Sequence, residues 1–302
     1  MCDFIYRDEG GAEFYTGHSQ QERKMLWDLL GPSKDMLQVW GKPEGFLNNQ
    51  IRDLSIECQF LITLMILRRN KTYTECGHQF GVCPTIVSMV FKTWLKFLNV
   101  TFKAHEDFII EKDNKFKKKP KAFRNKLLKD TEFVLDCTEF PVESTKNYEI
   151  QGNNWSDYKH GQTKKLFLAV NPWGCATVVS KLADGSMSDR EITKKCGFLK
   201  KKKIKGKTVL ADRGFQIEDL ILAKGGKLVI PPFLAGRKKF TYKELVRSRI
   251  ITRARIHIER FNQRLKLYKF IGDKIPYYKL DIIDDAVFVC CMLVNFSRVF
   301  AN

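Results

Sequence analysis

The sequence predicts an α/β fold in which a mixed sheet is flanked by helices and preceded by an all-α helix-turn-helix segment. Before residue 100, apolar residues recur at three- and four-residue steps in several segments, which is typical of amphipathic helices. From residue 132 onward, short apolar and β-branched runs alternate with helical patterns, which is typical of a sheet covered by helices. Two long helical patterns then close the chain.

The composition favours a folded protein that binds a polyanion. With 302 residues and 44% hydrophobic side chains, the chain can form one large domain or two ordinary ones. Its 53 basic and 34 acidic residues give a formal charge of +19, which favours nucleic acid as the partner. No apolar run reaches the roughly 20 residues that span a bilayer, so no membrane partner is expected. The acidic, polar N-terminus and nine scattered cysteines predict an intracellular protein without disulfides.

Three consecutive helical segments predict the helix-turn-helix. They span residues 54–69, 72–80 and 84–98. A glycine, Gly81, lies in the turn before the third helix, and Pro84 suits the first position of that helix. The third helix would lie in the DNA major groove and contact DNA through Ser88, Lys92 and Lys96. An ordinary helical hairpin fits the pattern equally well, and the net charge favours the DNA-binding interpretation.

We expect four parts along the chain. An N-terminal helix and loop segment would span residues 1–52, the helix-turn-helix domain 53–99, a basic linker 100–131 and the sheet domain 132–302. The linker contains a lysine run whose members are Lys117, Lys118 and Lys119. This run is interpreted as a phosphate-contacting arm or a nuclear-localisation signal, and the alternative is a solvated linker.

Two strands of the predicted sheet each end in an aspartate. The stretch at residues 132–140 is interpreted as a short apolar strand that places Asp136 at its end, and Asp212 follows the apolar run that begins at Thr208. If these strands are neighbours, the two carboxylates lie side by side and repel each other unless a cation compensates them. A carboxylate site suits magnesium or manganese. For either aspartate alone, a turn that satisfies the side chain is the simpler explanation.

A third carboxylate, Glu259, lies on the long helix predicted from about Tyr242 to Tyr268. The apolar stripe of this helix leaves Glu259 on the polar face, near Arg255 and Asn262. Because this polar face is strongly basic, Glu259 has two possible roles. It forms a salt bridge with Arg255, or it is a metal ligand at a solvent-filled cleft. Taken alone, the salt bridge is the better explanation.

Several motifs together resemble the transposases of the PIF/Harbinger superfamily, which are DDE superfamily endonucleases, and especially the animal subgroup often associated with THAP zinc-finger proteins. The resemblance runs from Leu54 to Asn295. It rests on Leu135-Asp136-Cys137-Thr138-Glu139, Trp155-Ser156-Asp157-Tyr158-Lys159-His160, Ser188-Asp189-Arg190-Glu191-Ile192-Thr193, Ala211-Asp212-Arg213-Gly214-Phe215 and Arg255-Ile256-His257-Ile258-Glu259-Arg260. The predicted helix-turn-helix also looks like the family's N-terminal DNA-binding module. No zinc-finger pattern precedes residue 50.

The resemblance implies an RNase H-like fold and a DDE triad formed by Asp136, Asp212 and Glu259. In such enzymes the triad binds two Mg²⁺ (or Mn²⁺) ions, which cut DNA at transposon ends and join the ends to a target. The implied protein is a nuclear, Mg-dependent transposase or transposase-derived endonuclease that acts on double-stranded DNA. A homo-oligomer on DNA and a second, element-encoded DNA-binding protein are compatible partners.

Other residues in the matching motifs are secondary candidates for DNA contact or for support of the triad. They are His160, Lys165, Asp189 and Arg255. For Asp189 the alternative is an acid placed favourably at a helix N-terminus. The alternative function is a domesticated, catalytically silent, sequence-specific DNA-binding protein. A scaffold or assembly factor is the remaining class, and no feature of the sequence favours it.

Overall fold

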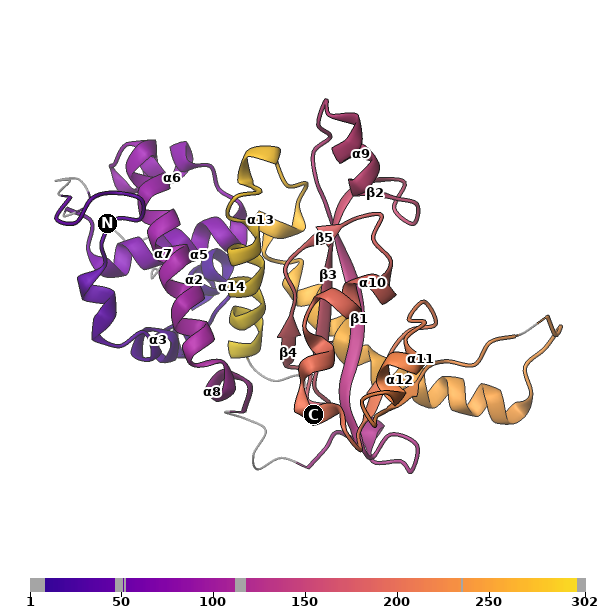
Figure 1. The fold of residues 1–302 in the computed structure, drawn as a ribbon. Coiled ribbons are helices and arrows are strands. Elements are labelled where there is room, and N and C mark those ends of the chain that lie inside the picture. Colours follow the sequence, from indigo (N-terminus) through magenta and orange to yellow (C-terminus); the bar gives the residue numbers. More distant parts are fainter. Residues whose placement is uncertain (1–8, 47–50, 52, 112–117, 235, 298–302) are drawn as a thin grey trace. The chain divides into compact units, whose positions relative to one another are not determined.

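The computed structural model describes residues 9–46, 51, 53–111, 118–234 and 236–297 (Figure 1). These residues form two compact units. The helical unit comprises the described residues up to Ile109 together with Leu265–Ser297, and the α/β unit comprises the described residues from Ile110 to Arg264.

The helical unit is built from short helices around three longer ones, α5, α7 and α14. Its elements are α2 (Glu9–Thr16), α3 (Gln20–Leu29), η1 (Pro32–Met36), α5 (Ile56–Arg69), α6 (Tyr73–Phe80), α7 (Pro84–Ala104), α13 (Lys269–Gly272), η5 (Tyr277–Lys279) and α14 (Ile283–Phe296), and α8 (Glu106–Glu111) follows α7. Capping boxes begin α3 at Ser19 and α6 at Thr72. These caps satisfy backbone N–H groups that a helix start leaves without partners, and α6 begins where the sequence predicts.

Helix α7 lies at the centre of this unit, with α5, α6 and α14 packed against it. Trp94 is fully buried, and its Nε1 donates a hydrogen bond to Oε1 of Gln59 over 3.1 Å. The ring of Phe60 lies 5.4 Å from that of Trp94. Most of the middle of α7 is buried, and its exposed residues lie in the first turn, Pro84 and Thr85, and near its end, Val100, Lys103 and Ala104.

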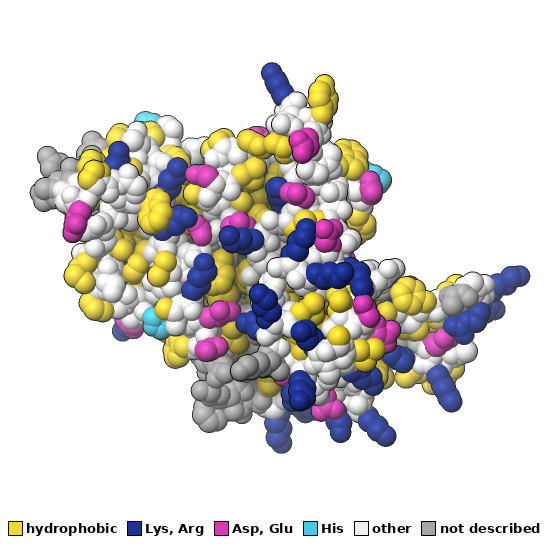
Figure 2. Space-filling view, in the orientation of Figure 1, with side chains coloured by type: hydrophobic (Ala, Val, Ile, Leu, Met, Phe, Trp, Pro, Cys, Tyr) yellow, Lys and Arg dark blue, Asp and Glu magenta, His cyan; other side chains and the backbone are white. Residues whose placement is uncertain are grey.

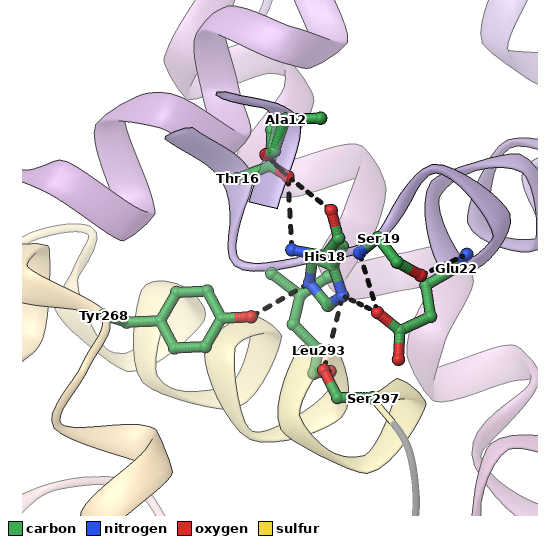
Figure 3. Close-up of polar contacts among 8 residues, drawn as sticks. All are labelled: Ala12, Thr16, His18, Ser19, Glu22, Tyr268, Leu293 and Ser297. Atoms are coloured by element: carbon green, nitrogen blue, oxygen red, sulfur yellow. Dashed lines mark hydrogen bonds and ion pairs between the residues drawn. The ribbon is translucent and has the colours of Figure 1, made fainter. Parts of the chain in front are cut away.

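A buried histidine joins the beginning of the chain to its end within the helical unit (Figure 3). His18 has no exposed surface, and its Nε2 lies 2.9 Å from the hydroxyl of Tyr268. Its Nδ1 lies 3.3 Å from Oγ of Ser297, which follows α14. A buried polar side chain is costly unless it is hydrogen-bonded, so these contacts fix the N-terminal helices against α14.

The junction between α6 and α7 has helix-turn-helix geometry. The two helices are bent by 104° at a short break, as expected for this motif. Gly81 ends α6 with φ 69°, a left-handed conformation that glycine adopts without strain. Cys83 precedes Pro84 without a side-chain cap hydrogen bond. Among the described residues no single helix could cross a bilayer; only α6 and α7 taken together, as a bent pair, have the length and composition for it.

The α/β unit contains one mixed sheet with helices on its faces. Its strands are β1 (Thr131–Pro141), β2 (Trp155–Ser156), β3 (Gly161–Val170), β4 (Ala176–Val179), β5 (Ala183–Asp184), β6 (Thr208–Leu210) and β7 (Lys227–Val229). The helices are α9 (Tyr148–Asn154), α10 (Asp189–Lys195), α11 (Glu218–Leu222) and α12 (Tyr242–Leu265), with 3₁₀ turns η2 (Lys121–Phe123), η3 (Phe198–Lys200) and η4 (Lys202–Ile204). The strand order is β2-β3-β1-β6-β7, and β4 and β5 also pair with β3.

Strand directions make the sheet mixed. β1 is antiparallel to β3 and parallel to β6, and β6 is parallel to β7. On one face, Phe133 and Leu135 pack into a core with Ile192 of α10 and Ile221 of α11. This arrangement, with a helix-turn-helix before it, confirms the predicted α/β, RNase H-like class.

Some predicted boundaries differ from those in the structure. Helices α13 and α14 pack with the N-terminal helices, whereas the sequence analysis grouped everything after residue 131 with the sheet. Helix α14 is buried along almost its whole length, and it packs against α7. This packing places α14 in the helical unit. Cys58 takes part in a disulfide, so the expectation of a disulfide-free protein was wrong at this position; seven other cysteines are free thiols.

The contact between Trp94 and Gln59 gives a stability prediction. Trp94→Phe removes the indole donor and leaves the buried Gln59 oxygen without it, so the free energy of unfolding should fall by about 1–3 kcal/mol. Denaturant unfolding followed by far-UV circular dichroism measures the change. The control is Trp40→Phe, since Trp40 is 59% exposed, and its expected effect is within about 0.5 kcal/mol. Equal effects of the two substitutions would contradict the central position of Trp94.

Candidate active site

Asp136 and Asp212 lie beside each other because β1 and β6 are parallel neighbours. In this pair Val134 is opposite Leu210, and side chains alternate between the two faces of a strand. Asp136 follows Val134 by two residues within β1, and Asp212 follows Leu210 by two residues, just beyond the end of β6, which brings the two carboxylates together there. The prediction that the first strand ends at Asp136 is wrong, because β1 continues to Pro141 through its pairing with β3. The predicted condition for juxtaposition, adjacent strands, is therefore met.

The surroundings of Asp136 disfavour its ionised form. Burial raises the pKa of the Asp136 carboxyl, and the negative charges of Asp212 and Asp189 raise it further, whereas Arg255 and a hydrogen bond from Asn262 lower it. The net direction is upward, which means that the nearby cation and donor do not fully compensate the burial and the like charges. An additional positive charge at this place would therefore stabilise the carboxylate.

Three residues of α12 share one helical face above the two aspartates. Arg255, Glu259 and Asn262 are spaced four and three residues apart, which places them on neighbouring turns of that face. Arg255 Nη1 lies 3.3 Å from Asp212 Oδ1, and Asn262 Nδ2 donates to Asp136 Oδ2 over 2.6 Å. Glu259, on the same face, is exposed.

The predicted salt bridge of Arg255 with Glu259 is thus not the one that the structure contains. Arg255 pairs with Asp212, and its side chain is only 15% exposed. A buried guanidinium needs an anion, and Asp212 supplies it. The role of Glu259 as a third metal ligand stays a prediction.

Asp189 is a further carboxylate next to this pair. It begins α10, and its Oδ2 lies 3.5 Å from the position that a Cβ would take at Gly214, two residues after Asp212. Burial raises the pKa of Asp189, Lys165 opposes this, and a hydrogen bond links Asp189 to Cys137. The position at a helix start also fits the simpler interpretation, an acid favoured by the helix dipole.

Lys165 is held inside the α/β unit. Its Nζ lies 3.6 Å from Oε1 of Glu139 and donates to the backbone oxygen of Met187 over 3.1 Å. These contacts follow from the sheet register, because Lys165 is opposite Glu139 in the β1–β3 pair. The lysine therefore neutralises carboxylates near Asp189, and its side chain is only 15% exposed.

The chemistry of the donor set fits a divalent cation at Asp136 and Asp212. Oδ1 of Asn262 and Nε of Arg255 are buried without a hydrogen-bond partner in the described part of the chain. The first is an oxygen acceptor beside Asp136, and amide and carboxylate oxygens are ligands that Mg²⁺ accepts. Within the residues that the structure describes, no group of three or more His, Cys, Asp or Glu side chains has the arrangement of a metal site.

The DNA-contacting residues predicted on α7 are engaged within the helical unit. Lys96 forms an ion pair with Asp285 at the start of α14, and Lys92 Nζ lies 3.8 Å from Asp281. Ser88 is hydrogen-bonded to Tyr73. The first turn of α7 is exposed at Pro84 and Thr85. Because the N-terminal residues of a recognition helix contact the base edges, that turn is the part of α7 best placed to meet DNA bases.

The remaining predicted residues are dispersed. Lys118 is exposed, Lys119 donates to the backbone oxygens of Lys129 and Thr131 over 2.8 Å each, and Lys117 lies outside the described residues. Lys119 therefore helps to hold the start of β1. His160 is exposed in a turn with φ 48°.

Asn262 is the residue whose role the sequence analysis missed. Its contact with Asp136 connects α12 to the central strand. The spacing from Arg255 and Glu259 could have pointed to it, because the three residues lie on one helical face. A periodicity argument identifies such a face but not what the face contacts.

Comparisons with known proteins match both units. Residues 135–295 match a family described as DDE superfamily endonuclease, and residues 52–104 match the helix-turn-helix of DDE superfamily endonuclease. The probable transposase for insertion sequence element IS702 from Microchaete diplosiphon is 25% identical over 222 residues, which cover 73% of this chain and 73% of that protein. No solved structure matches the chain.

The raised pKa of Asp136 predicts a pH-dependent cost of this carboxylate. As the pH rises above about 4, the unfolded chain ionises before the folded one, so stability is lost up to the folded pKa. Asp136→Asn should therefore increase the free energy of unfolding at pH 7 by about 0.5–2 kcal/mol. The gain should shrink toward zero near pH 3–4, measured by urea unfolding in EDTA.

The matched control for this measurement is Asp157→Asn, since Asp157 is exposed. It should give no gain that depends on pH. A loss of stability in Asp136→Asn at pH 7 would contradict the electrostatic description of the site.

Proposed function

The chain belongs to the DDE superfamily endonucleases, and from this premise we propose that it is a DNA transposase or a transposase-derived endonuclease that cuts and joins DNA. The observation that carries the proposal is the pair of carboxylates, Asp136 and Asp212, on adjacent parallel strands beneath the helical face of Glu259. Each of the three lies inside the segment that matches the family. The site belongs to the α/β unit, and the DNA-binding motif belongs to the helical unit.

We propose that Asp136, Asp212 and Glu259 hold two Mg²⁺ or Mn²⁺ ions. When bound, such ions would supply an activated water or DNA 3′-hydroxyl and stabilisation of the leaving oxygen in an in-line displacement. The chain's own residues prepare the site for this. Asn262 orients Asp136 through its hydrogen bond, and Arg255 places a positive charge beside Asp212, where phosphate oxygens would also be attracted.

Recognition of double-stranded DNA is proposed for the helix-turn-helix, with the exposed first turn of α7 at Pro84 and Thr85 facing the bases. The motif resemblances support membership of the PIF/Harbinger superfamily, in the animal subgroup associated with THAP proteins. A nuclear location, a homo-oligomer on DNA and a second element-encoded DNA-binding protein follow as proposals from that membership. The basic excess of the chain supports DNA as the partner.

One observation favours a second candidate, a domesticated protein that binds specific DNA sequences without cutting. Arg255, rather than a group of three carboxylates, accompanies Asp212 in the described structure. A cation from the protein can compensate the repulsion between the aspartates in the absence of catalysis. The two candidates differ in a single property, cleavage.

Cleavage tests the triad directly. The protein should nick or cut a plasmid that carries its terminal repeats in the presence of Mg²⁺, and Asp136→Ala, Asp212→Ala and Glu259→Ala should each reduce the rate at least about 100-fold, as loss of a group central to phosphoryl transfer does. Gel electrophoresis of the products measures the rate. Asp157→Ala, at an exposed position, should cut at the normal rate.

A readout that does not need activity separates the candidates further. Mg²⁺ should raise the unfolding temperature of the wild-type protein, because an ion that binds only the folded state stabilises that state. At an ion concentration of 100 times the Kd, the free energy of unfolding increases by about 2.7 kcal/mol. Asp136→Ala should abolish the shift. Cleavage that survives all three substitutions would refute the triad, and metal-independent DNA binding without cleavage would support the domesticated protein.

A further inference from the structure

We propose that the N-terminal half of α12 and the residues before it, residues 236–253, form a basic arm that binds the phosphate backbone of duplex DNA beside the cleaved bond. The inference rests on the proposed function, because it assigns a DNA-binding surface to the protein that would cut DNA. It goes beyond that function by naming a surface outside the carboxylate site and outside the helix-turn-helix.

The basic arm projects from the rest of the α/β unit (Figure 1). None of the described residues from 236 to 250 is buried, and the first buried residue of α12 is Ile251. Tyr242 is 80% exposed and Leu245 is 53% exposed. Because no core residue packs against this helical segment, its stability depends on local interactions such as capping at its N-terminus.

The helix in the arm is capped at its N-terminus. Thr241 accepts from the backbone N–H of Glu244, and the Glu244 carboxylate accepts from the N–H of Thr241 over 2.8 Å, which is a capping box. Arg237 Nη2 lies 2.6 Å from Oε1 of Glu244 and lowers the pKa of that carboxyl to about 2. This acid is therefore ionised, paired with a cation and unavailable to the other basic side chains.

What remains on the arm is a set of exposed basic side chains without a carboxylate partner in the described part of the chain. Figure 2 shows several of them along the projecting segment. They are Lys238, Lys239, Lys243, Arg247, Arg249 and Arg253. Six cations concentrated on one projecting element favour a polyanion, and backbone phosphates accept hydrogen bonds from both lysine and arginine.

The position of the arm along α12 gives its reach. Arg253 and Lys243 precede Glu259 by 6 and 16 residues, which corresponds to about 9 Å and 24 Å along the helix at 1.5 Å per residue. Duplex DNA advances about 3.4 Å per base pair. If the duplex follows the helix, the arm reaches phosphates about three to seven base pairs from the bond at the site.

An apolar groove of about 660 Å³ also runs along the arm, lined by Tyr242, Leu245, Val246 and Ile250 together with arginines. A second copy of the chain is a poor occupant for it. The same groove on a partner would bring Arg249 and Arg253 against like charges, with Glu244 already paired. Charge complementarity therefore selects DNA.

The test compares two charge-matched variants by the salt dependence of DNA binding. The arm variant is Lys243→Gln, Arg247→Gln, Arg249→Gln and Arg253→Gln, and the control is Lys181→Gln, Lys194→Gln, Lys224→Gln and Lys227→Gln, which are exposed elsewhere on the α/β unit. Fluorescence anisotropy with a 30-base-pair duplex, at about 50–300 mM NaCl in EDTA, gives the slope of log Kd against log salt.

The arm variant should lower that slope by about 3–4, since each lost phosphate contact removes about 0.9, and the control should change it by less than about 1. Replacing the three arginines by lysine should restore the wild-type slope, because charge is conserved. Circular dichroism should show the helix content unchanged.

Equal slopes for the arm variant and the control would overturn the proposal in favour of net charge alone. An unchanged slope with a smaller mass by light scattering would overturn it in favour of self-association through the arm. A wild-type protein that binds no duplex under any condition would overturn the proposed function as well. Intact wild-type binding with an unaffected arm variant would overturn only the arm.

Discussion

The parallel pairing of β1 with β6 is the constraint on which the candidate site depends. It brings Asp136 and Asp212, 76 residues apart in the chain, to one face at the end of β6. Two carboxylates so placed repel each other, and the cost has to be offset by a cation. In the structure Arg255 takes part of that role beside Asp212, yet the pKa of Asp136 stays raised, mainly by burial. The site thus retains an affinity for further positive charge.

The surface of helix α12 has three different parts. In its second half Ile251, Ala254, Ile258, Phe261 and Leu265 are buried. Arg255 and Asn262 contact the two aspartates, and the first turns of the helix lie outside the core. A helix that is anchored at one end by a hydrogen bond to the central strand has little freedom to rotate. Glu259 is therefore held on the face above the carboxylates.

Much of this could be predicted from the sequence, and the parts that could not have physical reasons. Periodicity identified the helices around Leu61 and Trp94, because burial on one face leaves a period in the sequence, and an apolar run identified the strand of Asp136. It could not show that Arg255 pairs with Asp212 rather than with Glu259, since partners across a fold leave no spacing signal. The placement of α14 was also missed, because an apolar helix buried nearly all round carries no mark of which unit covers it.

The packing of α14 against α7 has a consequence for DNA binding that neither helix has alone. Asp281 and Asp285, which the family match groups with the nuclease segment, neutralise Lys92 and Lys96 of the helix-turn-helix. Lysines paired in this way contact a phosphate only if their ion pairs open. Exchanging an aspartate for a phosphate as the partner of a partly exposed lysine gains little free energy. The attraction for DNA must then come from basic residues that have no acidic neighbour. In the described part of the basic arm, Lys238, Lys239, Lys243, Arg247, Arg249 and Arg253 meet that condition.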